Sequence, residues 1–373
     1  MSRRQRRYER RMKQRKEKRE KSLKKYLSFE NVCSYQSLYD AVKGSAKGVR
    51  WKESVQRYNL NIVSNIVKTR KNLLDGKDIR QGFIYFDICE RGKIRHIRSV
   101  HFRERVVQKT LCKNALAPVM TYNLITDNGA SQKGKGTLFA TKRLVKYLRW
   151  HYRKFGNNGY VLLVDFKSYF DNIEHQPLKN LISKYFIDEK IRKYSFDFID
   201  AFGEKGLGLG SETSQIDAVA YINKIDHYIK EVARIKGYGR YMDDSYIIHP
   251  SKKFLEELLI KLEKLYEEFG IKLNKKKTII CDLKHGFTFL KTRFFVTDSG
   301  KVILKPCRDS ITRERKKLKK QAKLLEKGIL IQEDIDISFV SWKGSMAHRN
   351  AKRTIRNMEK LYNDLFKVKG EKE

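Results

Sequence analysis

Residues 237–248 of the chain read GYGRYMDDSYII. Two glycines and an aromatic-rich run lead into the adjacent acids Asp243 and Asp244, and a β-branched and aromatic run follows. This pattern predicts a β-hairpin with both acids at its tip. Two neighbouring carboxylates repel each other unless a cation lies close by, so such a tip suits a hard cation. An ordinary acidic turn is the alternative, because Asp is a common turn residue.

A second acid follows an apolar run about 80 residues upstream, in residues 159–165, which read GYVLLVD. A continuous apolar run of this length predicts a buried strand, with Asp165 at its end. A carboxylate there is costly unless it is solvated, paired or metal-bound, and a salt bridge is the alternative. Three carboxylates on neighbouring strands are what two divalent ions about 3.5–4 Å apart need in phosphoryl transfer. Mg²⁺ suits such a site because it uses few protein carboxylates and completes its shell with phosphates and water.

The composition indicates a folded protein that binds a long polyanion. The 373 residues are 40% hydrophobic, which is enough for two or three packed units. The 83 Lys and Arg run along the whole chain and give a formal net charge of +40, which favours a nucleic acid. Aromatics at 12% argue against a disordered basic binder. For the competing class, a basic membrane-surface protein, we find no run of 18 apolar residues. We expect neither a membrane span nor a signal peptide.

The cysteines indicate the compartment. All five (Cys33, Cys89, Cys112, Cys281 and Cys307) are scattered, and none belongs to a CxxC pair. This usage is typical of a reducing cytoplasm, and it disfavours zinc sites or a disulfide framework. We therefore expect a cytoplasmic protein.

Two further segments suggest contact with phosphates. Residues 83–100 hold two strand-like runs around a Gly-containing turn, which predicts a hairpin with Lys93 and Arg95 on one face. Such cations are usually solvated, but in a polymerase they would neutralise a nucleotide triphosphate. Residues 127–137 read DNGASQKGKGT and lead into a helix near Thr137. Lys133 and Lys135 could contact phosphate there, or the loop could be a plain connection.

Residues 26–80 and the C-terminal region are expected to be helical, and the pattern of the first 25 residues is compatible with a helix. Residues 1–25 form a basic run with almost no apolar face, either a disordered tail or an RNA-binding arm, and the two are compatible. Residues 26–80 show roughly helical spacing of Tyr35, Leu38, Tyr39, Val42 and Trp51. From Asp309 three helices follow, the first strongly cationic, with apolar stripes on the second and third.

The motifs together resemble the reverse transcriptase superfamily, in the right order over nearly the whole chain. Tyr241-Met242-Asp243-Asp244 matches the family's xMDD motif, and Asp165 matches its first catalytic aspartate. The resemblance implies an α+β right-hand polymerase. It also implies that Asp165 and Asp243 are the main metal ligands, that the Phe166 carbonyl assists and that Asp244 is less direct. Phe170 falls where the family keeps an aromatic steric gate, which favours DNA as the product.

The resemblance extends to the substrate-binding segments. Asn274 and Lys277-Thr278 match the LNxxKT segment, and residues 286–290 match the primer grip. The nucleotide-binding residues that the resemblance implies are Lys93, Arg95, Phe170, Leu209, Gly210, Gln215 and Lys277. Candidate nucleic-acid contacts are Arg103, Arg105, Lys133, Lys135, Lys316, Lys317 and Lys320.

The departures from the family pattern indicate which kind of reverse transcriptase the sequence resembles. Many reverse transcriptases carry LPQG…SP, whereas here Leu209 stands in place of the Gln and Gln215 in place of the Pro. This is similar to bacterial diversity-generating retroelement and antiphage-defence enzymes, and it predicts lower fidelity because one discriminating contact is missing. The primer grip usually ends in Leu-Gly, and here it ends in Leu290-Lys291.

We therefore expect an RNA-directed DNA polymerase that copies a structured, element-encoded RNA from dNTPs, with two Mg²⁺ ions that Mn²⁺ could replace. Its role would be antiphage defence or a diversity-generating retroelement, in a bacterial or phage-encoded setting. Expected partners are the template RNA, the RNA/DNA duplex and an accessory protein or a second copy, with no membrane. The alternatives are an RNA-templated RNA polymerase and a catalytically idle RNA-binding scaffold. The expected domains are a basic arm at 1–25, fingers at 26–158, a palm at 159–300 with fingers-like helices at about 175–205, and a thumb at 301–373.

Overall fold

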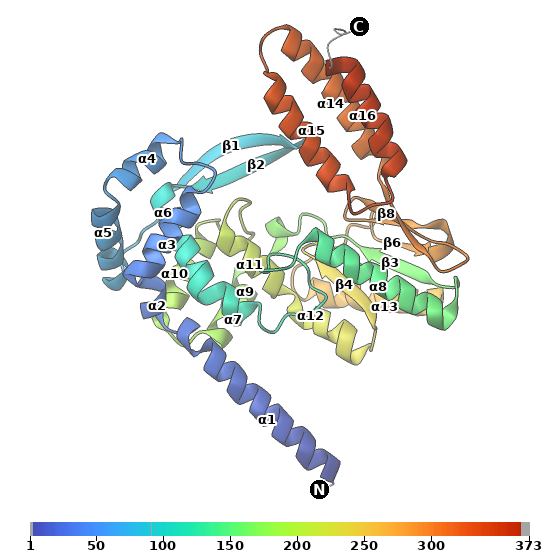
Figure 1. Ribbon diagram of the computed structural model, residues 1–373. Helices are drawn as coiled ribbons and strands as arrows, with labels where there is room; N and C mark the ends of the chain where they lie inside the picture. The colour runs from blue at the N-terminus through green and yellow to red at the C-terminus, as the bar shows by residue number, and fades with distance from the viewer. Residues whose placement is uncertain (1–2, 91, 367–373) are drawn as a thin grey trace. The chain divides into compact units, whose positions relative to one another are not determined.

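The computed structural model (Figure 1) describes residues 3–90 and 92–366. These residues divide into two compact units. The first unit comprises Met1–Gly134, Phe166–Val232 and Ile260–Leu273. The second comprises Lys135–Asp165, Ala233–Leu259 and Asn274–Glu373. Both units mix helices with antiparallel strands, as the α+β prediction requires. None of the described helices is long and apolar enough to span a membrane.

The first unit is mainly helical. Its α-helices are α1 Arg3–Leu23, α2 Phe29–Cys33, α3 Tyr35–Ala46, α4 Glu53–Leu60, α5 Ile62–Leu74, α6 Phe102–Leu111, α7 Ala117–Met120, α9 His175–Tyr185, α10 Glu189–Asp200, α11 Glu212–Tyr221 and α12 Asn223–His227. Short 3₁₀ segments are η1 Lys24–Tyr26 and η3 Phe170–Asn172, and π-helical segments are η2 Cys112–Leu116 and η4 Tyr228–Val232. The predicted hairpin is confirmed as β1 Phe83–Glu90 paired antiparallel with β2 Lys93–Val100.

The N-terminal region of the first unit differs in part from the sequence prediction. The basic run forms α1, and the described side chains of Arg6, Arg7 and Arg10 are exposed. In α3, Leu38 is fully buried, but Tyr39 is 37% exposed. Helical spacing alone therefore did not separate the apolar stripe of α3 from the aromatic residues on its flank.

The second unit holds the strands that carry the acids. Its elements are α8 Thr137–Phe155, β3 Tyr160–Val164, β4 Gly237–Tyr241, β5 Asp244–His249, β6 Ile279–Asp282, η5 Leu283–His285, β7 Phe287–Phe289, β8 Thr292–Val296, β9 Val302–Pro306, α14 Arg308–Glu326, α15 Gln332–Met346 and α16 Lys352–Phe366. Helix α13, Lys252–Glu267, begins in the second unit and ends in the first.

The main sheet of the second unit has the order β4-β5-β3-β6, and every neighbouring pair is antiparallel. Helix α8 covers it (Figure 1), because its apolar side chains share one core cluster with the sheet. Leu144 and Leu148 of α8 are buried there together with Val161 and Tyr246. Phe294 brings the second sheet, β7-β8-β9, into the same cluster. This shared core gives β3 and β5 a rigid support.

The last three helices form the predicted three-helix unit (Figure 1). Phe339, Trp342 and Met346 of α15 are buried against Leu318 of α14 and Met358 of α16. The interpretation of Trp342 as a core residue is therefore confirmed. Helix α14 carries the exposed Lys316, Lys317 and Lys320.

Two glycines of the second unit allow a matched test of packing. Gly286 and Gly328 share the left-handed region, with φ of 69° and 67°. A Cβ at Gly286 would lie 2.6 Å from the Phe294 carbonyl oxygen, whereas a Cβ at Gly328 meets nothing within 4 Å. We expect Gly328→Ala to lower the free energy of unfolding by about 1 kcal/mol. Gly286→Ala should lower it by roughly 1–3 kcal/mol more, because backbone must move. Urea unfolding measures both, and equal losses would contradict the packing argument.

Candidate active site

Strand pairing brings two of the three predicted acids together. Val164, the last residue of β3, pairs with Ser245 of β5. The next position on each strand is therefore Asp165 opposite Asp244. Asp243 precedes Asp244 in the turn between β4 and β5. The register thus places all three acids at one end of the sheet, which was only a hypothesis from the sequence.

The turn that carries the acids is held in an uncommon conformation. Met242 has a φ of 58°, in the left-handed region that side chains other than Gly and Asn rarely adopt. Arg240, only 1% exposed, donates a hydrogen bond from Nη1 to the Met242 carbonyl at 3.0 Å. A buried charged donor of this kind stabilises the strained turn. This hydrogen bond therefore supports the turn that carries Asp243.

Burial and the neighbouring carboxylates perturb the pKa of Asp244. Burial, followed by the negative charges of Asp243 and Asp165, raises the pKa of Asp244 to about 6. Lys277 opposes this effect and donates from Nζ to Asp165 Oδ2 at 3.1 Å. Its side chain is 66% exposed, whereas that of Asp165 is 14% exposed. The ammonium group shows that a cation is accommodated beside these acids.

A segment that sequence reasoning assigned only to the nucleotide also holds Asp165 in place. The Asn274 N–H donates to the Asp165 carbonyl at 2.8 Å, and Thr278 Oγ1 donates to the same oxygen at 3.3 Å. The Asp165 N–H donates to Thr278 Oγ1 at 3.3 Å. Asn274 and Thr278 thus fix the backbone of Asp165. The LNxxKT match was the signal for these residues, but not for this role.

The donor set fits a hard divalent cation. Asp165, Asp243 and Asp244 offer only oxygen ligands, and their mutual repulsion would be relieved by positive charge. Among the described residues no three His, Cys, Asp or Glu side chains converge to hold a metal ion. Mg²⁺ commonly binds through one or two carboxylates and takes its remaining ligands from substrate phosphates and water.

In the first unit the structure joins two predicted nucleotide-binding segments. The Leu207 N–H donates to the Phe170 carbonyl at 2.8 Å, and the Gly206 N–H donates to the Ile173 carbonyl at 2.8 Å. The buried His175 ring bonds the Gly206 carbonyl through Nε2 at 2.7 Å. Gly206 has a φ of 85°, and a Cβ there would lie 3.0 Å from the Asp171 carbonyl oxygen. Only glycine fits this close approach without strain.

The same segment meets the base of the β1–β2 hairpin. A Cβ on Gly210 would lie 3.4 Å from Ile97 Cγ2, and Arg98 donates from Nη1 to the Phe202 carbonyl at 3.3 Å. Leu209 beside Gly210 is half-buried. Arg95 is exposed on β2, as predicted, and the side chain of Lys93 lies outside the described part of the chain.

Gln215 and the Lys133 loop also meet in the first unit. Ser131 of that loop donates from Oγ to Gln215 Oε1 at 3.5 Å. Phe166 directly follows Asp165 in the chain, and its backbone pairs with Leu273 of the same unit.

The predicted nucleic-acid contacts fall on several elements. Arg105 donates from Nη2 to Ser99 Oγ at 2.9 Å, so it also holds the end of β2. Arg103 is half-buried on α6, and Lys133 is exposed on its loop. Lys135 lies over the Phe139 ring, 5.2 Å from its centroid. Lys317 bonds Ser338 Oγ.

The Leu290-Lys291 departure has a structural counterpart. These two residues form the turn between β7 and β8, with φ of 45° and 59°. Such a two-residue hairpin turn needs positive φ at both positions, which glycine supplies without strain. Lys291 therefore accepts backbone strain where the family usually has Gly, and its charge lowers the raised pKa of Asp244.

A buried acid in α11, Asp217, was not anticipated from the sequence. Burial raises its pKa to about 8, and its Oδ1 has no hydrogen-bond partner among the described residues. The unfolded chain releases this proton near pH 4, so folding stability falls as pH rises from about 4 to 8, by up to about 1.4 kcal/mol per pH unit. We expect Asp217→Asn to remove that loss and to gain stability relative to the parent chain between about pH 5 and pH 7.5.

Urea unfolding at about pH 5 and pH 7.5 measures the difference in the free energy of unfolding between Asp217→Asn and the parent chain. The exposed Glu189 provides the control Glu189→Gln, for which the difference should not change with pH. A constant difference for Asp217→Asn would mean that the folded chain already holds this carboxylate ionised.

Three carboxylates at one end of an antiparallel sheet are compatible with a metal-dependent nucleotidyltransferase of the polymerase type. Comparison with protein families agrees: residues 81–294, more than half of the chain, match the family "Reverse transcriptase (RNA-dependent DNA polymerase)". The chain belongs to this family, whose members are RNA-directed DNA polymerases that use divalent metal ions. None of the curated proteins compared matches the sequence.

Solved structures with the same fold include telomerases. Candida albicans telomerase, in complex with a TWJ fragment of telomeric RNA, is 14% identical with a TM-score of 0.50; the match covers 82% of this chain and 58% of that one. Apo telomerase of Candida tropicalis, truncated from its C-terminal domain, is 15% identical with a TM-score of 0.46, over 60% and 55% of the chains. The chain thus spans little more than half of these telomerase chains. The Candida albicans likeness supports the right-hand polymerase fold.

Proposed function

We propose that this chain synthesises DNA on an RNA template by two-metal nucleotidyl transfer. The observation that carries this proposal is the register that sets Asp165 opposite Asp244, with Asp243 beside them in a fixed turn. Family membership supplies the reaction class. The three acids would supply the ligands for the metal ions. The ammonium group of Lys277, 3.1 Å from Asp165, supports this because a positive charge already lies beside them.

Each acid has a distinct role in the proposal. Asp165 and Asp243 would hold two Mg²⁺ ions, with the Phe166 carbonyl assisting and Asp244 less direct. Bound there, the ions would activate the attacking 3′-hydroxyl and stabilise the leaving pyrophosphate. Asn274 and Thr278 keep the Asp165 backbone in position for this role. The high pKa of Asp244 fits a carboxyl that is a poorer ligand than its neighbours.

The nucleotide would be bound mainly by residues of the first unit. Lys93 and Arg95 would neutralise the triphosphate with help from Lys277, and the ring of Phe170 would exclude a ribose 2′-hydroxyl. A second group would lie at the nascent base pair: Leu209, Gly210 and Gln215. This division follows the family resemblance, and the bond from Leu207 to Phe170 supports it, since it joins the two segments.

The template would be RNA held through its backbone. The chain has a net charge of +40, and the exposed lysines of α14 suit phosphate contact without base readout. The bound telomeric RNA of the Candida albicans telomerase supports RNA as the partner by analogy of fold. We assign residues 1–25 to an arm, 26–158 to fingers, 159–300 to the palm and 301–373 to the thumb.

The proposed biological role is supported by the departures at Leu209 and Gln215. They favour an enzyme dedicated to one structured, element-encoded RNA, in antiphage defence or in a diversity-generating retroelement, with an accessory protein or a second copy as partner. Sequencing of the cDNA made in cells, with inspection of the adjacent kilobase of genome, separates these roles. A template repeat beside a variable gene indicates diversification, whereas a non-coding RNA beside a toxin-like gene indicates defence.

Primer extension by the purified chain tests the chemistry. On a primed RNA template we expect dNTPs to be incorporated with Mg²⁺, less selectively with Mn²⁺, and not at all with EDTA. Preferential use of rNTPs would instead indicate an RNA-templated RNA polymerase. Absence of any extension, together with tight RNA binding, would favour the idle scaffold.

A further inference from the structure

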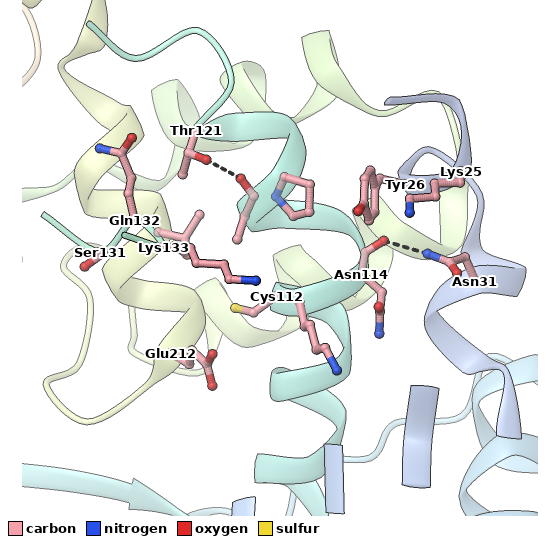
Figure 2. Close-up of a pocket in the computed structure, with 14 residues that line it drawn as sticks. Lys25, Tyr26, Asn31, Cys112, Asn114, Thr121, Ser131, Gln132, Lys133 and Glu212 are labelled. Carbon is pink, nitrogen blue, oxygen red and sulfur yellow. Dashed lines mark hydrogen bonds between the residues drawn. The ribbon is translucent and has the colours of Figure 1, made fainter. Parts of the chain in front are cut away.

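A cavity of about 530 Å³ in the first unit holds none of the residues assigned above to metal or nucleotide (Figure 2). Lys25 and Tyr26 of η1 form one side, and Ser131, Gln132 and Lys133 form the other. Cys112 and Asn114 of η2 lie between them (Figure 2). This volume is in the range of pockets that hold small molecules or single groups of a larger ligand.

The cavity has an excess of positive charge. Its only acid among the described lining residues, Glu212, accepts a bond from Lys109 at 2.8 Å, so it is already neutralised. Lys113 is engaged by Asp40 at 3.2 Å. Lys25 and Lys133 have no carboxylate partner within the described part of the chain. Burial raises the pKa of the Cys112 thiol, so the floor is neutral. The ligand that fits this charge is an anion.

The remaining lining suits a flat polar ring. The half-buried Tyr26 offers an aromatic face, and Lys25 Nζ lies 4.7 Å from its centroid. Three amides are held in place by their own nitrogen atoms, Asn31 to the Asn114 carbonyl at 3.2 Å, Asn114 to Thr110 Oγ1 at 3.1 Å and Gln132 to the Asn128 carbonyl at 2.8 Å. A stacking face, fixed amides and lysines together are what an unstacked nucleotide requires.

The neighbouring helix indicates a strand rather than a free nucleotide. Helix α1 ends at Leu23 and leads directly through Lys24 into the Lys25-Tyr26 side of the cavity. It is about 30 Å long and rich in Arg and Lys along its whole length. A free nucleotide would make no use of such a cationic track. Several consecutive phosphates would use it.

We propose that this cavity receives one unstacked nucleotide of single-stranded RNA, with its base on Tyr26 and its phosphate between Lys25 and Lys133, while flanking phosphates lie along α1. The inference rests on the proposed function only in taking RNA as the polyanion. In this proposal the basic arm, helix α1, leads the bound RNA to the cavity at Lys25 and Tyr26. It also separates recognition of unpaired RNA from the acids that perform the chemistry.

Binding of a fluorescein-labelled, unstructured 15-nucleotide RNA to the full chain tests this site by anisotropy. We expect Tyr26→Leu to raise the Kd by about 5- to 150-fold, because base stacking is lost. Tyr26→Trp should retain binding, since it keeps a ring. Lys133→Met should raise the Kd and reduce the salt dependence by about one phosphate contact. Binding of a blunt RNA/DNA duplex should be unchanged in the two Tyr26 variants, because a paired base cannot enter the cavity.

Matched controls lie in the same unit. Tyr35→Leu removes a ring that is 53% exposed and outside the cavity, and Lys68→Met removes an exposed charge on α5. The inference is wrong if Tyr26→Leu behaves as Tyr35→Leu does, or if duplex binding falls in parallel. Primer extension distinguishes the two proposals. If Tyr26→Leu leaves the Kd for single-stranded RNA unchanged while the parent chain extends primers, only this inference is wrong. If Tyr26→Leu raises that Kd but the parent chain does not extend primers, only the proposed function is wrong.

Discussion

Replacement of Asp243 by Asn is expected to lower the rate of nucleotide addition by at least about 1000-fold, and replacement of Asp165 by Asn should do the same. Both substitutions keep the shape of the side chain and remove the negative charge that a divalent ion requires. Asp244→Asn should cost less, because the proposal gives that carboxyl a less direct role. The measurement is single-turnover primer extension on an RNA template with saturating dNTPs.

The fold should survive these changes. Asp165 and Asp243 raise the pKa of Asp244 by their charge, so removal of either charge relieves repulsion and should not lower thermal stability. RNA affinity should also be retained. Glu257→Gln, at an exposed acid of α13 in the same unit, is the matched control and should leave the rate unchanged. An Asp243→Asn chain with a tenth or more of the parent rate would refute the assignment of this acid as a metal ligand.

Replacement of Phe170 by Val is expected to raise the use of rNTPs relative to dNTPs by about 10- to 100-fold, since the ring no longer excludes the 2′-hydroxyl. The comparison is the ratio of kcat/KM for each ribonucleotide to that for its deoxynucleotide. The change should come mainly from the ribonucleotide. Incorporation of dNTPs should fall much less.

Phe170→Tyr is the internal control because it keeps the ring and should keep the selectivity. Phe170 packs edge-on against Tyr169, with ring centroids 5.9 Å apart, so Val also leaves some space unfilled. A thermal melt of each variant separates that packing loss from the change in sugar choice. If Phe170→Val discriminates as the parent does, the sugar is selected by another group.

Local pattern predicted most of the elements in this protein. Alternation and glycine placement predicted the two hairpins, and the 3.6-residue period predicted the stripe of Phe339, Trp342 and Met346. These signals are local because each depends only on which face of one strand or helix is buried. The three acids could be named for the same reason, since Asp165 ends an apolar run and Asp243 and Asp244 stand at the tip of a predicted hairpin.

Contacts between distant segments could not be predicted in this way. The pairing of Val164 with Ser245 joins positions about 80 residues apart, and the hold of Asn274 and Thr278 on Asp165 spans more than 100. Packing of many side chains sets these partners, and no single stretch records it. The burial of Asp217 in α11 shows the limit best, because a polar residue in a helix usually faces water.

The bond between Leu207 and Phe170 has a consequence for how this enzyme can evolve. Phe170 is expected to select the sugar, and the segment with Leu209 is expected to contact the base pair. Hydrogen bonds of Gly206, Leu207 and His175 connect the two. We therefore expect a substitution that displaces one of these segments to displace the other. On the proposed roles, selectivity for the base and selectivity for the sugar would change together during evolution.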